Sequence, residues 1–232
     1  SAVCDGRRCL TLVRRPKAMR DGCDGSESSN RPAEREGTGV QLIAGEPSDY
    51  LGGDVVVEVD HPAVRALSDE LRAAHPDDVD FTRAAFEWVR DRIRHSVDAQ
   101  DPRITVTAGE VLSAGVGLCY AKSHLLAAVV RAAGVPAGLC YQQLSDGGEP
   151  FLHGLVAVYL AGGWHRQDPR GNRAGIDAQF RLGREQLAYP VTEGSAASTR
   201  EVHVHPSPTV ITALRGARDA LELCRTGLPA TP

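Results

Sequence analysis

Apolar residues recur along the chain with two periods, and these periods separate the predicted helices from the predicted strands. The β-branched run 55–59 is typical of a strand. After it, apolar residues three and four positions apart predict a helix that begins near Pro62 behind an Asp60 cap and ends before Pro76. The apolar positions of this helix are Val64, Leu67 and Leu71.

Two more helices are predicted before the middle of the chain. The first begins at a cap formed by Asp80 or Thr82. The second is short, with Thr107 and Glu110 as a capping box and Gly115 at its end. The apolar stripe of the first consists of Phe81, Ala85, Trp88, Val89 and Ile93.

A longer helix is predicted over 119–133, directly after the glycine-containing loop 115–118. Gly134 and Pro136 end it, because neither residue continues a helix well. We expect this helix to bury one face, made of Leu125, Leu126, Val129 and Ala132.

Strand-type segments follow the long helix. They cover 138–143, 153–160 and 164–168. A turn over 161–163 joins the last two strands, and a final helix is predicted over 210–224. Helices followed by antiparallel strands, with no βαβ unit and no internal repeat, predict an α+β fold.

Composition adds limits to this picture. The chain has 232 residues, a net charge of −4, 42% hydrophobic residues and 24% charged residues, as in ordinary globular proteins. Residues 1–37, rich in Arg, Gly, Asp, Ser and Glu, predict a disordered tail that contains the only methionine, the candidate start Met19. A single domain is left over 38–228. Without a long apolar run, an apolar leader or a basic stripe, we expect no membrane and no nucleic-acid partner.

The six cysteines form no evenly spaced framework, which predicts free thiols in a reducing cytoplasm. Cys4, Cys9 and Cys23 lie in the predicted tail without a fourth ligand nearby, which argues against zinc. His203 and His205 would share one face of a strand, but no further ligand lies near them in the sequence. We therefore expect no metal and no cofactor, and we find no acidic loop of the calcium-binding type.

Cys119 is the strongest candidate for chemistry. A cysteine in an apolar segment is usually a core residue, as we expect for Cys140 and Cys224. Cys119 differs because a glycine-containing loop delivers it to the first turn of a predicted helix, where unpaired N–H groups and the helix dipole favour a thiolate. The same N–H groups can hold an oxyanion. Cys119 therefore has the surroundings of a nucleophile.

A thiolate catalyst needs a histidine that protonates the leaving group and a third residue that orients the imidazole. His153 begins one predicted strand and Asp168 ends the next. The alternative for Asp168 is a purely local role in starting a turn before Pro169.

The register of the hairpin decides whether His153 and Asp168 can meet. A two-residue turn at 162–163 would leave them roughly 13 Å apart along the sheet. A reversal centred near 160–161 would set them directly opposite each other on one face. We therefore predict a loop of about four residues over 159–162, or an equivalent bulge.

Three blocks of sequence carry a resemblance to a known family. The first has the sequence GLCYAKS over 117–123 and continues through 125–126 and 131–137. The second is His153-Gly154 with the later 158–160, and the third is Trp164 with Asp168-Pro169. In this order and spacing, the blocks resemble the nucleophile, His and Asp blocks of the bacterial transglutaminase-like family, part of the papain-like cysteine-enzyme superfamily. The best-matched core covers about 80–190.

This resemblance implies a papain-like fold, with the nucleophile helix packed on a small antiparallel sheet, and a Cys-His-Asp triad of Cys119, His153 and Asp168. The chain departs from the family at two places. Residues 154–157 are Gly-Leu-Val-Ala, where members often have an aromatic and an acidic residue. Residues 170–172 are Arg-Gly-Asn, where a Thr is often found.

Lys122 is one of only two lysines in the chain, and it lies three residues after Cys119 on the same side of the helix. A cation in the first turn opposes the helix dipole. Either its stem covers apolar surface, or its charge supports the thiolate or binds a substrate carboxylate. Tyr120 is a second candidate for such support. His124 lies off the apolar stripe and is expected to be structural.

We expect a cysteine-dependent enzyme of acyl chemistry that hydrolyses a peptide-type amide through a thioester acyl-enzyme. With an amine as acceptor, the same site would be a transglutaminase or an amide synthase, with an amide or thioester donor. A non-catalytic binding module on the same fold is the alternative from another class. In either enzyme case, the substrate is a peptide, a protein or a small acyl compound.

Overall fold

The structure, a computed structural model, describes residues 41–145, 149–190 and 200–232. The predicted tail 1–37, with Cys4, Cys9 and Cys23, lies outside the described residues.

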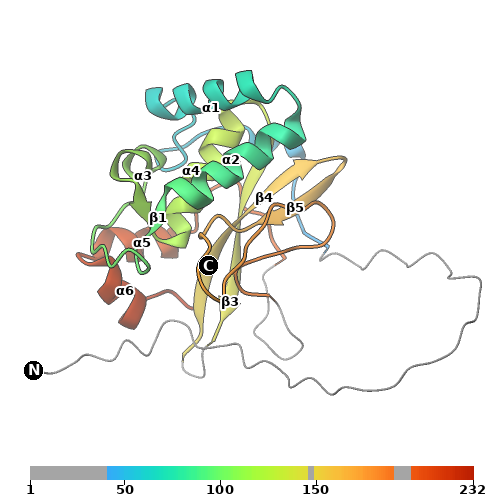
Figure 1. Cartoon of the computed structure of the whole chain (residues 1–232). Helices are drawn as coiled ribbons and strands as arrows, with labels where there is room; N and C mark the ends of the chain where they lie inside the picture. Colours follow the sequence, from blue (N-terminus) through green and yellow to red (C-terminus); the bar gives the residue numbers. More distant parts are fainter. Residues whose placement is uncertain (1–40, 146–148, 191–199) are drawn as a thin grey trace, which may run out of the picture.

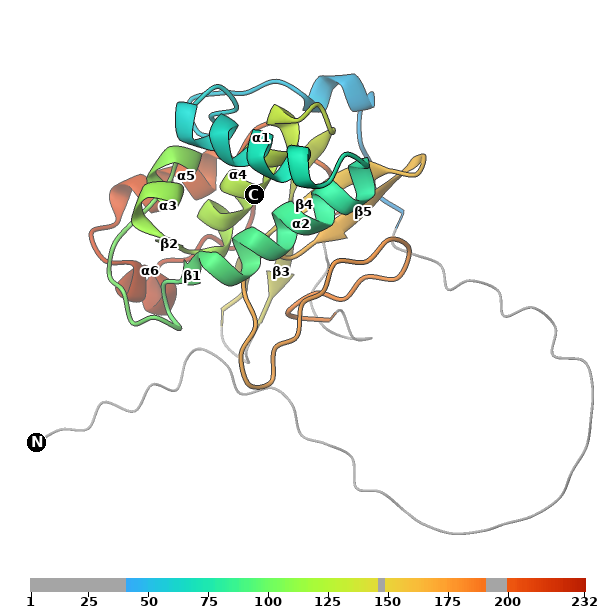
Figure 2. The same cartoon turned by 45° about the horizontal axis from the view of Figure 1, so that its top comes forward.

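Helix α4 (Cys119–Ala132) lies at the centre of the fold, between three other helices and a sheet (Figures 1 and 2). The helices are α1 (Pro62–Ala74), α2 (Asp78–Arg92) and α3 (Ala108–Ala114), and the antiparallel sheet has the order β3 (Ala137–Leu144), β4 (Phe151–Leu160), β5 (Gly163–Gln167). The predicted α+β fold, with the nucleophile helix packed on a small antiparallel sheet, is confirmed. Thirteen of the fourteen α4 residues are buried, so the helix is enclosed on all sides and not only along the predicted stripe.

Shorter elements complete the described part of the chain. They are the 3₁₀ helix η1 (Pro47–Tyr50), the parallel pair β1 (Arg94–His95) and β2 (Val116–Gly117), and the helices α5 (Pro208–Gly216) and α6 (Ala220–Thr226). Both views place α5 and α6, in red, on the side where β1 lies (Figures 1 and 2). The Ala220 N–H donates to the Pro102 carbonyl, which ties α6 to the segment after β1.

The helix caps lie close to their predicted positions, with two corrections. Helix α1 begins at Pro62 as predicted, but its N-cap residue is His61 and not Asp60. Helix α2 begins at Asp78, because the Asp77 side chain accepts hydrogen bonds from the N–H groups of residues 79 and 80. The Thr107–Glu110 capping box forms as predicted.

The run 55–59 is not a strand, and this prediction was wrong. The Asp54 side chain accepts hydrogen bonds from the Val56 and Val57 N–H groups, both at 2.7 Å. These bonds fold the segment into an Asx-type turn, in which the two N–H groups are paired locally and not with a neighbouring strand. Val57 is fully buried while Val55 is 77% exposed.

The single helix predicted over 210–224 is two helices, and this prediction was also wrong. Helix α5 ends at Gly216, and α6 begins again behind Asp219, which accepts hydrogen bonds from the N–H groups of Leu221 and Glu222. A side-chain cap inside an apolar period restarts the helix in a new direction.

The β4–β5 hairpin differs from both turns considered from the sequence. Leu160 pairs with Gly163, so the connection is the two residues Ala161 and Gly162, with φ of 52° and 80°. A two-residue turn with φ positive at both positions suits the right-handed twist of a hairpin. The predicted four-residue loop over 159–162 is therefore wrong, and so is the prediction that His153 pairs directly with Asp168.

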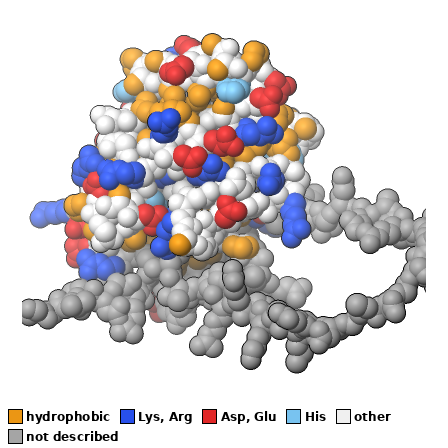
Figure 3. All heavy atoms as spheres, in the orientation of Figure 1, with side chains coloured by type: hydrophobic (Ala, Val, Ile, Leu, Met, Phe, Trp, Pro, Cys, Tyr) orange, Lys and Arg blue, Asp and Glu red, His pale blue; other side chains and the backbone are white. Residues whose placement is uncertain are grey.

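Charged side chains of both signs are interspersed on the face shown in Figure 3. No helix in the described residues is long and apolar enough to cross a bilayer.

Gly154 allows the N-terminus of α4 to pack against β4. A Cβ at this position would lie 3.0 Å from the Tyr120 Cα and 3.1 Å from the Tyr120 nitrogen. The Tyr120 hydroxyl also donates to the Leu152 carbonyl. The departure from the family pattern after His153 therefore coincides with a backbone-to-backbone contact between helix and strand.

We predict that Gly154→Ala destabilises the fold by about 2 kcal/mol, because the new methyl group must push against helix backbone. Denaturant unfolding followed by circular dichroism measures the change. Gly52→Ala is the matched control, since a Cβ there meets nothing within 4 Å. Equal unfolding midpoints for both variants would contradict the tight contact.

Candidate active site

Cys119 is the first residue of α4, and the segment directly before it is held in place by its contacts. Pairing of β1 with β2 holds the incoming chain, and Gly117 lies so close to its surroundings that a Cβ would be 3.0 Å from the Thr105 Oγ1. The N-cap residue Leu118 is extended and offers no side-chain cap. The N–H groups of the first turn are therefore left without a side-chain acceptor, as a site for developing negative charge requires.

His153 and Asp168 meet although they do not pair across the hairpin. Val156 pairs with Gln167, so the ladder sets Asp168 level with Leu155, one diagonal step from His153. Diagonal neighbours on one face lie about 7–8 Å apart and are within reach of longer side chains. The His153 Nε2 lies 2.8 Å from the Asp168 Oδ2.

Asp168 forms a local turn and also contacts the histidine. Its Oδ1 accepts from the Arg170 N–H at 3.0 Å, and its Oδ2 accepts from the Ala188 N–H at 2.9 Å in addition to the imidazole. Burial alone would raise the pKa of Asp168, but the His153 charge and these hydrogen bonds outweigh it and lower the pKa. The carboxylate is thus held ionised although it is buried.

The Cys119 sulfur lies close enough to His153 for its charge to act on the imidazole. Because Asp168 occupies Nε2, Nδ1 is the imidazole nitrogen available to the sulfur. The Gly154 N–H donates to the same sulfur at 3.4 Å. Burial would lower the pKa of His153, but the charges of Asp168 and Cys119 raise it to about 10. An imidazolium and an N–H donor beside the sulfur both favour a thiolate.

Solvent exposure decreases from Cys119 to His153 to Asp168, as expected for a nucleophile that must meet substrate and an acid that must stay sheltered. Cys119 is 8% exposed, His153 is 3% exposed and Asp168 is 1% exposed. Cys119 is therefore the most accessible of the three residues, and the charge that orients the imidazole is sheltered from water. Low solvent access strengthens the electrostatic interactions between the three groups.

The surroundings of Lys122 match neither interpretation of the sequence, in which its stem covers apolar surface or its charge supports the thiolate or binds a substrate carboxylate. It is fully buried, and its Nζ donates to three backbone carbonyls, those of Arg90 (3.1 Å), Ile93 and Arg170 (2.9 Å). Burial, helped by the Arg170 charge, lowers the pKa of Lys122 to about 7. Three acceptors nevertheless match the three N–H donors of an ammonium. Lys122 thus joins α2, α4 and the segment after Asp168.

Tyr120 and His124 have structural contacts. Tyr120 is 1% exposed, and its hydroxyl donates to the Leu152 carbonyl. The His124 Nδ1 lies 2.7 Å from the Val106 carbonyl, and burial lowers the pKa of His124 to about 4. His124 is therefore a satisfied core histidine, as predicted.

Several groups around the triad were not found from the sequence. The Tyr189 ring meets the His153 ring edge-on, with centroids 5.0 Å apart. Gln142 is opposite His153 in the β3–β4 register, and Arg170 contacts both Asp168 and Tyr189. Only Arg170 carried a signal, as a departure from the family pattern. Tyr189 and Gln142 lie in segments whose sequence has no feature that points to chemistry.

The two other histidines considered for a metal have separate partners. The His205 Nδ1 lies 2.8 Å from the Asp54 Oδ2, whereas the His203 Nε2 lies 3.9 Å from a Glu201 oxygen. In the parts of the chain that the structure describes, no three His, Cys, Asp or Glu side chains gather where they could hold a metal.

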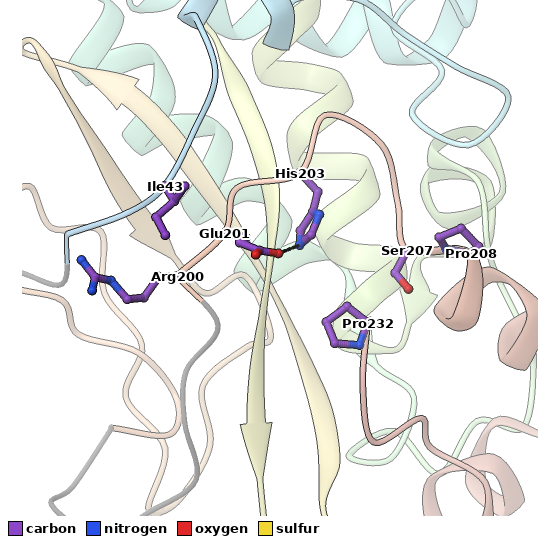
Figure 4. A pocket seen from close by; sticks show the side chains of 7 residues that line it. All are labelled: Ile43, Arg200, Glu201, His203, Ser207, Pro208 and Pro232. Carbon is purple, nitrogen blue, oxygen red and sulfur yellow. Dashed lines mark ion pairs between the residues drawn. The ribbon is translucent and has the colours of Figure 1, made fainter.

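A hollow of about 640 Å³ lies beside His203 (Figure 4). Its lining residues are Ile43, Arg200, Glu201, His203, Ser207, Pro208 and Pro232. None of the three triad residues lines it, so this cavity is separate from the candidate active site.

Residues 65–169 match the family model described as the transglutaminase-like superfamily. The match includes Cys119, His153 and Asp168. The chain contains a transglutaminase-like superfamily domain. No curated protein matches the chain.

The solved structures to which the chain is similar are distant. A candidate cysteine protease from Cytophaga hutchinsonii is 16% identical with a TM-score of 0.47, covering 56% of this chain and 46% of that one. The periplasmic domain of TgpA from Pseudomonas aeruginosa is 24% identical with a TM-score of 0.41 and coverage of 53% and 47%. A TGase is 18% identical, with a TM-score of 0.41 and coverage of 60% and 42%. The chain thus spans less than half the length of each.

We predict that Lys122→Met destabilises the transglutaminase-like domain by about 3 kcal/mol, because three buried carbonyls lose their donor. Thermal unfolding measures the loss. Arg92→Met, an exposed substitution on α2, is the control and should change stability by less than about 0.5 kcal/mol. Melting of Lys122→Met at the wild-type temperature would show that the carbonyls do not depend on the ammonium.

We also predict that iodoacetamide labels Cys119 at pH 6 at least roughly tenfold faster than Cys140, because only a thiolate reacts well. The pKa of His153 is about 10, so its imidazolium persists at pH 6 and is lost only as the pH rises through about 10. Burial raises the pKa of Cys140 to about 12, which keeps that sulfur a thiol. Peptide mass spectrometry gives both rates.

His153→Ala should slow labelling of Cys119 at pH 6 and leave that of Cys140 unchanged. Equal, slow labelling of the two cysteines in the wild-type protein would instead favour a non-catalytic binding module.

Proposed function

We propose that this transglutaminase-like domain hydrolyses a peptide-type amide through a thioester on Cys119. One observation carries the proposal: a buried carboxylate orients the His153 imidazole, with Nε2 and Oδ2 only 2.8 Å apart, and the charges of Asp168 and Cys119 raise the pKa of that imidazole. A core cysteine needs neither an imidazolium nor a buried acid, and both are costly to bury without a purpose in the site.

In the acylation step, the Cys119 thiolate attacks the carbonyl carbon of the substrate. A bond forms between sulfur and carbon, and the carbonyl π electrons move to the oxygen. The N–H of Cys119, at the start of α4, donates to this oxyanion. The His153 imidazolium then gives its proton to the leaving nitrogen, the carbon–nitrogen bond breaks, and an amine departs.

In the deacylation step, neutral His153 takes a proton from water, and the hydroxide oxygen attacks the thioester carbon. The carbon–sulfur bond breaks, a carboxylic acid leaves, and the thiolate–imidazolium pair is restored. Asp168 remains ionised throughout and keeps Nδ1 directed at the sulfur. Water is the acceptor we propose, because it needs no second binding site. A peptide, a protein or a small acyl compound is the substrate class we expect.

The test uses a panel of peptide amides and acyl thioesters, each incubated with and without added primary amines. We expect the free acid as product at a rate independent of the amine. Cys119→Ala should reduce turnover to the background, and His153→Ala should reduce it about 10³-fold through loss of proton transfer. Cys140→Ala removes a buried thiol elsewhere in the domain and is the control that retains turnover.

An amine-dependent product would replace hydrolysis by acyl transfer and make the domain a transglutaminase or an amide synthase. Turnover retained by Cys119→Ala would remove the mechanism altogether.

A further inference from the structure

The ring of Tyr189 packs against the imidazole of His153. Its ring stands at 89° to the imidazole with centroids 5.0 Å apart, an edge-to-face arrangement that aromatic rings favour. Two hydrogen bonds hold the tyrosine at its two ends. The Arg170 Nε donates to its hydroxyl at 3.1 Å, and the Gln142 Nε2 donates to its carbonyl at 2.7 Å.

The Arg170 guanidinium is in turn held by one carboxylate. Its Nη1 lies 2.5 Å from the Asp98 Oδ2 and its Nη2 lies 3.0 Å from the Asp98 Oδ1. The Arg170 side chain is 2% exposed and that of Asp98 is 26% exposed. Two parallel bonds fix the plane of a guanidinium, and here that plane directs Nε at Tyr189.

Arg170 is also tied to the triad by its backbone. Its N–H donates to the Asp168 Oδ1 at 3.0 Å and its carbonyl accepts from Lys122 at 2.9 Å. A change in the side chain leaves these backbone bonds available. The side-chain path from Asp98 through Arg170 to Tyr189 can therefore be tested separately from the acid that orients His153.

We propose that Asp98, Arg170 and Tyr189 are positioning residues that hold the His153 imidazole in the plane where Nδ1 faces the Cys119 sulfur. This inference rests on the proposed function. With the ring in place, water is kept from the His153–Asp168 hydrogen bond, and an imidazole cannot rotate away without losing its edge contact. If the hydrogen bond from Arg170 to the Tyr189 hydroxyl is lost, the Tyr189 ring is held less firmly against the imidazole. The imidazolium then supports the Cys119 thiolate less well.

The charged and titratable groups around His153 come from each neighbouring element. They are Cys119 of α4, Asp168 beyond β5, Tyr189 and, from β1, His95, whose pKa burial and the Arg170 and Lys122 charges lower well below its usual value. Neither Asp98 nor Arg170 touches His153. The side-chain path from them to His153 runs through Tyr189.

The test measures the rate of Cys119 alkylation by iodoacetamide from pH 5 to pH 10.5 in the full chain. For Asp98→Asn we expect a rate at pH 6 roughly tenfold below wild type, because a less firmly held imidazolium supports the thiolate less well. At pH 10.5, above the pKa of about 10 of His153, the imidazolium is lost in both proteins, and the rates should agree within about twofold. Tyr189→Phe keeps the ring and loses only the hydrogen bond to its hydroxyl. We therefore expect its Cys119 alkylation rate at pH 6 to be about threefold below wild type.

Asp101→Asn is the matched control. Asp101 lies in the same loop as Asp98 but pairs with Arg94 and Arg103 and not with Arg170. Its alkylation profile should superimpose on wild type. Circular dichroism checks that each variant is folded, and if Asp98→Asn does not fold, Tyr189→Phe decides, because it changes neither charge nor volume appreciably.

Wild-type profiles in both Asp98→Asn and Tyr189→Phe would overturn the positioning role and leave the proposed function standing. Slow alkylation of wild-type Cys119 at pH 6, equal to that of Cys140, would overturn the proposed function itself. A uniform loss at every pH would show a merely structural role and also overturn the inference.

Discussion

Contact between the N-terminus of α4 and strand β4 is the constraint on which the rest of the site depends. Because Gly154 has no Cβ, the strand backbone can approach the Tyr120 backbone, and this approach brings the Gly154 N–H to 3.4 Å from the Cys119 sulfur. His153 directly precedes that glycine in β4, and its Nε2 lies 2.8 Å from the Asp168 Oδ2. A single close packing of helix on strand thus positions the candidate nucleophile and one N–H donor to its sulfur.

The surroundings of this contact hold an unusual number of buried charges, and backbone groups satisfy most of them. Lys122 donates to three carbonyls, while Asp168 accepts from two N–H groups in addition to His153. Buried charges are costly unless each is paired and hydrogen-bonded. Buried charges that are hydrogen-bonded in this way tolerate little movement of their partners. They therefore favour one geometry of the segment after β5, which holds Asp168, Arg170 and Tyr189.

Prediction from sequence worked best where the signal is local. The capping box at Thr107, the start of α4 and the three strands follow from turn chemistry and apolar period. Prediction failed where a side chain takes the backbone N–H groups that a regular strand or helix would use. Asp54 does this before the valine run, and Asp219 does it between α5 and α6. The hairpin register was missed because three candidate turns differ by only one residue each, and sequence spacing does not choose among them.

The residue types and their order along the chain pointed to a cysteine at a helix start, a histidine and an aspartate as the candidate catalytic groups. The tertiary structure decided how they meet. His153 and Asp168 lie on a diagonal and not opposite each other, because a two-residue turn sets the ladder and longer side chains span the remaining distance. It also decided the role of Lys122, as burial among three carbonyls depends on segments that are far apart in sequence. Such long-range contacts leave no local pattern, and only the folded chain reveals them.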